Sequence, residues 1–518
     1  SLLFINIVHA QNILTDGNIK GSVFDQKGEP IIGATIMNNT TKVGTVTDLD
    51  GLFTIAAQPG STLVVSYVGF KPKTIQIGTE KEYKIIIEEN ASLLDEVVVI
   101  GYATQKKKLV TGATLQVDGN RIKELHTPNP LTALQSMSPG MQITKTSGEP
   151  GSSYKVYIRG MGTIGNADPL YIVDGVPGNI SNINPADIKS IDVLKDAASA
   201  AIYGARAANG VVLITTHRGE GEDKVRVAYD TYIGISNAPD YKWYVDATTQ
   251  AMLDDEYSKN TYGYGINFSQ MVPNWDKVLS GEWKGTNWYK EIKNKNAPTQ
   301  NHSVTISGGS KKSSYFTSFS YSSQEGTLGK PVQTKQDRYT FRLNADQTIF
   351  SAKGRDIVRM GETINFIYAN KDGSLSGRST EGLGALGMIM GGSPFMPIYD
   401  DNGDYHGPIA YAPYAPNPIA YLVYNSNNNK KNYQLNTNAF ITIEPIKNLV
   451  FRSNFGLTMD AEESRAYIPK YNLAPEYTSQ ETKVSQDISL GFSRLTFENT
   501  LNYKFSLDEN KHNFDVLA

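Results

Sequence analysis

The sequence contains no cysteine, which excludes disulfides, catalytic cysteines, zinc sites made of thiolates and a lipidated N-terminal cysteine. Neither sign of charge is in excess, because 49 Lys and Arg stand against 52 Asp and Glu. This balance leaves no basic surface that would point to nucleic acid as a partner. Long apolar runs are also missing, and no window approaches the roughly 20 residues of a membrane helix. If the chain enters a membrane, it must do so with strands of a barrel.

Signatures of enzymes are equally scarce. The six His are scattered without an H-E-x-x-H pairing, and there is no G-x-S-x-G elbow. Gly160, Gly162 and Gly165 satisfy the dinucleotide pattern, but the residues after them favour a strand rather than the helix that would hold a pyrophosphate. Carboxylates such as Asp254 and Asp255 could form a glycosidase pair only at the correct separation in space. We predict no catalytic residue, no metal site and no cofactor, and keep a glycan-degrading enzyme at the cell surface as an alternative.

The first residues indicate export. Residues 2–8 are mostly apolar, and Val8, His9 and Ala10 precede Gln11. Apolar or small residues three positions and one position before a cut are typical of a signal-peptidase site. We therefore interpret residues 1–10 as the remnant of a signal peptide, with a buried first strand as the alternative.

Residues 17–89 alternate between short runs of β-formers and turns that contain Gly or Pro. This alternation predicts a small β-sandwich. The spacing G-x-V-x-D-x-x-G-x-P at Gly21 to Pro30, followed by Gly33 and by Thr47 to Phe53, resembles the carboxypeptidase-regulatory-like (transthyretin-like) domain.

Residues 94–107, LDEVVVIGYATQKK, hold four consecutive β-formers from Val97 to Ile100. The run has no period that would bury a single face, so it suits pairing through its backbone. We expect this strand to lack a partner in its own fold and to be captured by another protein. An ordinary buried core strand is the alternative.

Residues 111–219 carry a long run from Ile183 to Thr216, INPADIKSIDVLKDAASAAIYGARAANGVVLITT. The alternation from Asp187 to Leu194 predicts a strand, and the small residues after Asp196 predict a helix that ends at Gly204. We interpret these residues as the frame of a compact α/β domain, not as an active site.

These segments closely resemble the SusC/RagA-type TonB-dependent outer-membrane transporters of Bacteroidetes. Residues 94–107 resemble the TonB box, and residues 111–219 resemble the plug domain, most clearly in Ser147 to Gly151, Pro169 to Pro177 and Ile183 to Thr216. The resemblance implies a SusD-like lipoprotein partner and a place among the lipids of a Gram-negative outer membrane. It also implies that TonB, energised by ExbB and ExbD, binds the box through Asp95, Glu96, Val97, Val98, Val99, Ile100, Gly101 and Tyr102.

From Lys224 the pattern changes to long amphipathic strands, which are typical of a membrane barrel wall, with a soluble sandwich as the alternative. They are predicted at Lys224 to Ile235, His302 to Gly308, Ser314 to Tyr321, Tyr339 to Asn344, Thr363 to Tyr368, Tyr433 to Ile443, Leu449 to Met459 and Leu495 to Phe505. Transporters of this size class close about 22 strands, so residues 224–518 would supply roughly half. We therefore expect an incomplete barrel, from a fragment or from a chain that a separate chain completes. The predicted fold is mainly β: a small β-sandwich, an α/β plug domain and part of a transmembrane antiparallel β-barrel.

Two long polar segments between the strands are rich in aromatic residues, which stack on sugar rings and on peptide side chains. The candidate ligand contacts are Trp243, Trp275, Trp283, Trp288, Tyr399, Tyr405, Tyr411 and Tyr414. Packing of the loops against one another, or a position at the membrane interface, is the alternative for each. The resemblance implies TonB-dependent import of a nutrient, for which we favour an oligosaccharide or glycan and keep oligopeptides as the alternative. A ligand-binding signalling receptor, which in the family carries an additional N-terminal domain, is a further alternative.

Overall fold

The computed structural model describes residues 18–518 except 27, 42, 68–69, 71, 89–96, 101–102, 107–113, 164, 197–199, 220–223, 241–243, 353, 376–384, 492 and 508–511. The predicted signal remnant, residues 1–10, lies outside this part. The chain divides into two compact units, Ser1–Val98 with Thr104–Thr111, and Val99–Ala103 with Gly112–Ala518. Each helix in the described part is too short or too polar to cross a membrane.

The first unit is the expected small β-sandwich. One sheet has the strand order β4-β1-β7 and the other has the order β3-β2-β5-β6. Alternate residues of the short strands, among them Val23, Ile36 and Val65, are fully buried between the sheets. The strands are β1 (Asn18–Phe24), β2 (Thr35–Asn38), β3 (Gly44–Val46), β4 (Leu52–Ala56), β5 (Thr62–Ser66), β6 (Lys73–Gln76) and β7 (Glu82–Ile86). The strand β6 has no alternation of buried and exposed residues, so sequence periodicity does not mark it.

The second unit begins with the α/β domain that the sequence predicts. Its sheet has the order β10-β15-β16-β13-β14, and a hairpin of β11 and β12 lies beside it. Side chains cap both helices at their first turns, Asp118 on α2 and Asn129 on α3. The elements are β10 (Thr114–Asp118), α2 (Gly119–Glu124), α3 (Pro130–Met137), β11 (Met141–Lys145), β12 (Tyr154–Ile158), β13 (Leu170–Val173), β14 (Val176–Pro177), β15 (Ile188–Leu194) and β16 (Val211–Thr216), with short 3-10 helices η2 (Ile180–Asn182), η3 (Pro185–Asp187) and η4 (Ala201–Ala207).

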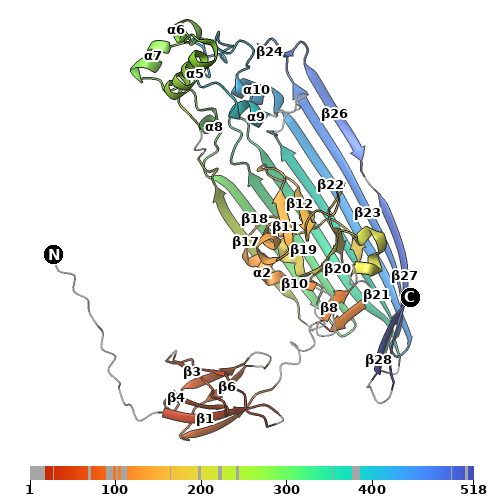
Figure 1. Cartoon of the computed structure of the whole chain (residues 1–518). Helices are drawn as coiled ribbons and strands as arrows, with labels where there is room; N and C mark the ends of the chain where they lie inside the picture. Colours follow the sequence, from red (N-terminus) through yellow and green to blue (C-terminus); the bar gives the residue numbers. More distant parts are fainter. Residues whose placement is uncertain are drawn as a thin grey trace, which may run out of the picture. The chain divides into compact units, whose positions relative to one another are not determined.

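A 10-stranded antiparallel sheet, here called the wall, curves around this domain (Figure 1). Its path is β17-β18-β19-β20-β21-β22-β23-β27-β28, and β26 also pairs with β23. The last seven strand stretches predicted from the sequence each fall within one observed strand. The wall strands are β17 (Arg226–Ser236), β18 (Ala297–Gly309), β19 (Ser313–Glu325), β20 (Lys335–Ala352), β21 (Arg355–Asp372), β22 (Asn428–Ile446), β23 (Leu449–Ile468), β26 (Lys483–Leu490), β27 (Arg494–Leu507) and β28 (His512–Leu517).

Alternate residues of the wall face opposite sides. On β20, Arg342 and Asn344 are buried and bond to the α/β domain, whereas Tyr339 and Phe341 are exposed on the opposite face. The wall therefore has an inner face toward the α/β domain and an outer face that is largely apolar, as its alternation predicts.

The long connections at one end of the wall fold into a helical cap (Figure 1). Its elements are α5 (Ala247–Tyr262), α6 (Phe268–Met271), α7 (Trp275–Ser280), α8 (Trp288–Glu291), α9 (Ala385–Met390), α10 (Pro418–Asn425), β24 (Tyr471–Ala474) and β25 (Tyr477–Ser479). They share one apolar core, in which Phe268, Trp288, Phe395 and Leu422 are buried. The sequence predicted polar loops here, and the structure replaces them with a packed layer.

Candidate functional site

The predicted capture strand has a partner in the structure. Val97, Val98, Val99 and Ile100 form β8 (Val97–Ile100), which pairs with β9 (Ala103–Lys106) in a sheet of two strands. The expectation of an unpartnered strand is therefore wrong, because β9 of the same chain pairs with it. An isolated hairpin of two strands is marginally stable in water, so a competing strand can replace this partner. Asp95, Glu96, Gly101 and Tyr102 lie outside the described residues.

A buried ion pair joins the α/β domain to the wall. Asp174 and Gly175 form the two-residue turn between β13 and β14, with φ of 49° and 93°. An Asp-Gly pair suits this turn because both positions need positive φ. The turn brings the Asp174 carboxylate 3.0 Å from a guanidinium nitrogen of Arg342 on β20, and both side chains are almost fully buried.

A second carboxylate, that of Asp187, faces the same Arg342. Its oxygen lies 3.8 Å from Nε of the guanidinium. Burial raises the pKa of Asp187, and the nearby charge of Arg342 opposes this rise only in part. One cation of the wall is thus held between two acids of the domain inside it.

Other inner residues of β20 extend this contact along the strand. Asn344 donates to the hydroxyl of Thr216 at 2.8 Å and to the carbonyl of His217 at 2.6 Å. Asp346 accepts from Arg218 at 2.7 Å. Arg338 donates to the carbonyls of Ser181 at 3.0 Å and Pro128 at 2.7 Å. A single wall strand therefore holds several separate segments of the α/β domain.

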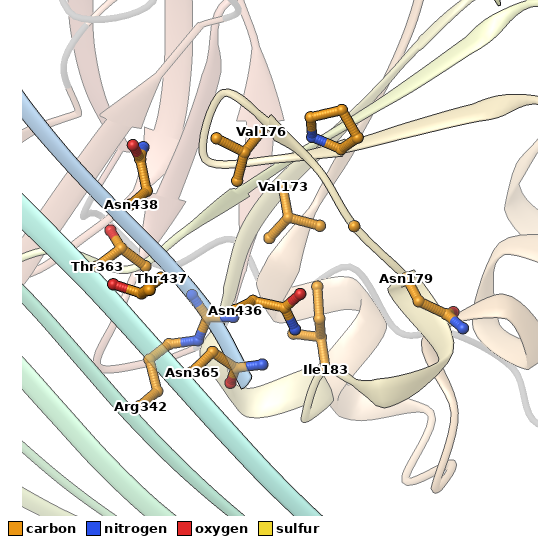
Figure 2. Close-up of a pocket in the computed structure, with 12 residues that line it drawn as sticks. Val173, Val176, Asn179, Ile183, Arg342, Thr363, Asn365, Asn436, Thr437 and Asn438 are labelled. Carbon is orange, nitrogen blue, oxygen red and sulfur yellow. The ribbon is translucent and has the colours of Figure 1, made fainter. Parts of the chain in front are cut away.

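A small cavity lies beside Arg342, between the β13–β14 hairpin and the wall (Figure 2). Asn365 and Asn436 approach it from the wall, with Val173 and Val176 of the hairpin opposite. Its volume of about 20 Å³ is room for about one water molecule. The contact between the β13–β14 hairpin and the wall therefore includes polar side chains and a gap of about one water molecule, unlike a closely packed apolar core.

Glu149 makes the second buried contact between the domain and the wall. Its carboxylate accepts from Lys371 of β21 at 2.7 Å and from the backbone N–H of Leu375 at 2.6 Å. Burial by itself raises the pKa of Glu149, but the hydrogen bond and charge of Lys371, with the bonds from Leu375 and Ser374, outweigh it. The pKa therefore lies below its usual range. A cavity of about 370 Å³ adjoins this carboxylate and is lined by Ser147, Gly148, Glu149, Gly326, Thr327, Leu328, Thr334, Leu375, Leu386 and Gly387.

The candidate ligand aromatics divide into buried and exposed residues. Trp288 is fully buried and donates through its indole N–H to the carbonyl of Ser393 at 2.8 Å. Its ring packs the loops together, which is the alternative that the sequence left open. Trp275, Trp283, Tyr405 and Tyr411 also pack against the core of the cap, whereas Tyr399 and Tyr414 are exposed. Trp243 lies outside the described residues.

In the described part of the chain, no group of three His, Cys, Asp or Glu side chains could hold a metal ion. The glycines of the dinucleotide pattern, Gly160, Gly162 and Gly165, lead to strand β13 rather than to a helix.

Sequence reasoning missed Glu149 and Arg342 as contacts between the α/β domain and the wall. The alternation of Arg338, Thr340, Arg342 and Asn344 with Tyr339, Phe341 and Leu343 is the signal that could have suggested an inner position for Arg342. Nothing local marks Glu149, because Lys371 lies 222 residues away along the chain.

Comparisons with known proteins agree with this architecture. Residues 19–99 match the CarboxypepD_reg-like domain, and residues 106–211 match the TonB-dependent Receptor Plug Domain. TonB-dependent receptor P26 of Formosa agariphila is 32% identical over 507 residues, which cover 95% of this chain and 48% of the relative. TonB-dependent receptor SusC of Bacteroides thetaiotaomicron is 29% identical over 401 residues, 75% of this chain and 37% of the relative.

A solved structure of the RagAB peptide importer in an open-open state has a TM-score of 0.64 and 29% identity. The likeness covers 82% of this chain and 48% of that chain. The chain thus spans about half or less of the length of each of these relatives. The relatives found are receptors and importers rather than enzymes. With its regulatory-like sandwich, its plug and its antiparallel wall, the chain belongs to the SusC/RagA-type TonB-dependent receptors.

Proposed function

We propose that this chain acts in TonB-dependent import of an oligosaccharide or glycan across the outer membrane of a Gram-negative Bacteroidetes cell. The observation that carries the proposal is the plug itself, held inside a curved wall by a few buried polar contacts such as Arg342 with Asp174. Such a plug blocks a passage, yet it is attached through groups that can exchange partners with water. A force that pulls on the plug could therefore break these contacts and open the passage.

The outer face of the wall supports the membrane location. One cross-strand row on this face runs through Val304, Phe319, Phe341, Phe366, Leu435 and Met459. Apolar rows on the outer face and polar residues on the inner face are the pattern of an outer-membrane barrel.

The hairpin of β8 and β9 supports TonB as the source of force. Residues 95–102 would bind TonB by strand addition: β8 would separate from β9 and pair with a strand of TonB. TonB is in turn energised by ExbB and ExbD. A SusD-like lipoprotein would close the passage over the helical cap, and the exposed Tyr399 and Tyr414 would contact the substrate. Oligopeptides are the second candidate substrate, because the structural neighbour RagAB is named a peptide importer.

Proline in β8 tests this function. Val98→Pro with Ile100→Pro removes two backbone donors, and we expect uptake of a labelled oligosaccharide to fall to background while surface display persists. The control, Val98→Thr with Ile100→Thr, keeps both donors and should import normally. Full uptake by the proline variant would refute capture of β8 by TonB. If the parent protein imports labelled peptides but not the labelled oligosaccharide, oligopeptides are the substrate.

A signalling receptor makes a different prediction. If the chain only relays ligand occupancy, the parent protein should change transcription without accumulating labelled substrate in the cell. Import without such a change would support transport.

A further inference from the structure

The outer face of the wall has a sharp boundary between apolar and polar rows. At this boundary a row of aromatic rings crosses five strands through His302, Tyr321, Tyr339, Tyr368 and Tyr433. Neighbouring rings are in contact, with centroids between 4.9 and 6.4 Å apart. Tyrosines are enriched where a barrel passes from lipid to water. This tyrosine row therefore marks one edge of the lipid.

The next rows toward the helical cap are polar. Two residues beyond the tyrosine row, the outer face presents Gln300, Ser323, Asp337, Asn370, Lys431 and Glu463. The hydroxyl of Tyr321 donates to Asp337 at 2.9 Å, so a ring of the boundary reaches into the polar row. Residues at this height face the headgroups of the leaflet on the cap side.

A groove of about 610 Å³ opens two residues further along the strands. Its wall residues Asp372, Asn429, Arg465 and Gln486 form one cross-strand row on β21, β22, β23 and β26, which lie side by side in Figure 1. Parity along each strand places them on the outer face with the tyrosine row, about 13 Å from it along the strands.

The chemistry of the groove is that of a site for neutral sugars. Its lining includes the amide side chains of Gln333, Asn427, Asn428, Asn429 and Gln486, and the exposed ring of Tyr467 adds an aromatic surface that can stack on a sugar. The charged groups there already have partners in the wall. Arg465 lies 2.9 Å from Glu463, and Asp372 accepts from Asn429 at 2.6 Å. A phosphate would have to compete with Glu463 for Arg465. The amide nitrogen of Asn429 already donates to Asn370 and Asp372, and that of Gln486 donates to Glu463. The hydroxyl groups of a sugar would therefore donate to the amide oxygens, which displaces no ion pair.

We propose that this groove binds the sugar headgroup of a glycolipid in the leaflet on the cap side of the wall. The proposal rests on the outer-membrane location proposed above, and it adds a lipid partner distinct from the transported substrate. The row of Asp372, Asn429, Arg465 and Gln486 lies on the outer face, so an occupant bound to it should arrive from the leaflet rather than through the transport path.

The test measures binding of a fluorescent diglycosyl diacylglycerol, a glycolipid with an uncharged sugar headgroup, to the protein extracted from outer membranes into mixed micelles. Asn429→Leu with Gln486→Leu removes two amides of the groove, and we expect binding about tenfold weaker. The matched control is Gln300→Leu, a polar outer residue on the distant strand β18, which should bind as the parent does. Parental binding by the double variant, or an equal loss in the control, would overturn the proposal.

Two further measurements are needed. Competition experiments distinguish a glycolipid of the membrane from a soluble saccharide, and fractionation tests the outer-membrane location on which the proposal rests. The free disaccharide of that headgroup should compete much more weakly than the glycolipid, and equal competition would overturn a membrane source in favour of a soluble saccharide. Phospholipid micelles without glycolipid should not compete. Membrane fractionation tests the location separately: a protein found in the outer membrane without glycolipid preference would refute this proposal alone, and a protein found elsewhere would refute both.

Discussion

Arg342 of the wall lies 3.0 Å from Asp174 of the plug, and Asp174 occupies a turn position with a φ of 49°. Asp174 therefore has two tasks, because it adopts the backbone conformation of the hairpin turn and supplies the counter-charge of a buried guanidinium. A buried pair of this kind is a weak source of net stability when it is complete. Removal of one partner is costly because the other charge stays buried alone. The contact thus makes the seated position of the plug specific.

Substitutions of Asp174 and Arg342 should separate the contribution of the charges from that of the turn conformation at Asp174. Asp174→Asn keeps a residue that tolerates positive φ but removes the charge, and we expect a loss of about 1.5 to 3 kcal/mol in unfolding free energy. Arg342→Ala leaves Asp174 and Asp187 without their cation and should cost about 3 to 5 kcal/mol.

Thermal unfolding of the detergent-solubilised protein measures both losses. The control is Lys430→Ala, which breaks an exposed pair with Glu462 and should cost less than about 1 kcal/mol. If Arg342→Ala were no worse than this control, the buried pair would not hold the plug.

Glu149 should make the seating of the plug depend on pH. Its folded pKa lies below its unfolded value, so its charge stabilises the folded state at neutral pH. This contribution is lost as the pH falls through the lowered folded pKa, where the carboxylate takes up a proton. We expect Glu149→Gln to melt below the parent at neutral pH and the difference to shrink on acidification. A difference that stays constant down to strongly acidic pH would show that the charge of Glu149 is irrelevant.

The sequence predicts those features of the fold that are local. Asp174 and Gly175 between two apolar runs indicate a hairpin, and the alternation in the wall strands gives their two faces. Contacts between distant segments leave no such trace, as the bond between Glu149 and Lys371 illustrates. The helix α5 escaped prediction for another reason: it buries little besides Ala247, Ala251 and Ser258, so it has no apolar stripe to recognise.

Gly210 should be essential for the stability of the plug. Its φ is 91°, and an added Cβ would lie 2.8 Å from Cδ1 of Ile158. We expect Gly210→Ala to destabilise the plug by about 1 to 3 kcal/mol through strain. Gly162→Ala is the control, since its nearest neighbour would be an ordinary 3.9 Å away in Asn209. Equal melting temperatures of the two variants would contradict this assignment.

Buried and exposed aromatic residues of the cap should differ in what their removal changes: buried ones should affect stability, and exposed ones should affect substrate binding. Trp288→Ala opens a cavity in the core of the cap and should cost about 3 to 5 kcal/mol. Tyr399→Ala removes a ring that is 53% exposed, so it should leave the melting temperature nearly unchanged. If exposed tyrosines contact the substrate, Tyr399→Ala should weaken binding of a labelled oligosaccharide mixture several-fold, as the loss of one stacking contact implies. Exposed Leu279, on α7, supplies the control Leu279→Ala, which should change neither property. A stable Trp288→Ala variant with impaired binding, beside a Tyr399→Ala variant with normal binding, would reverse the two roles.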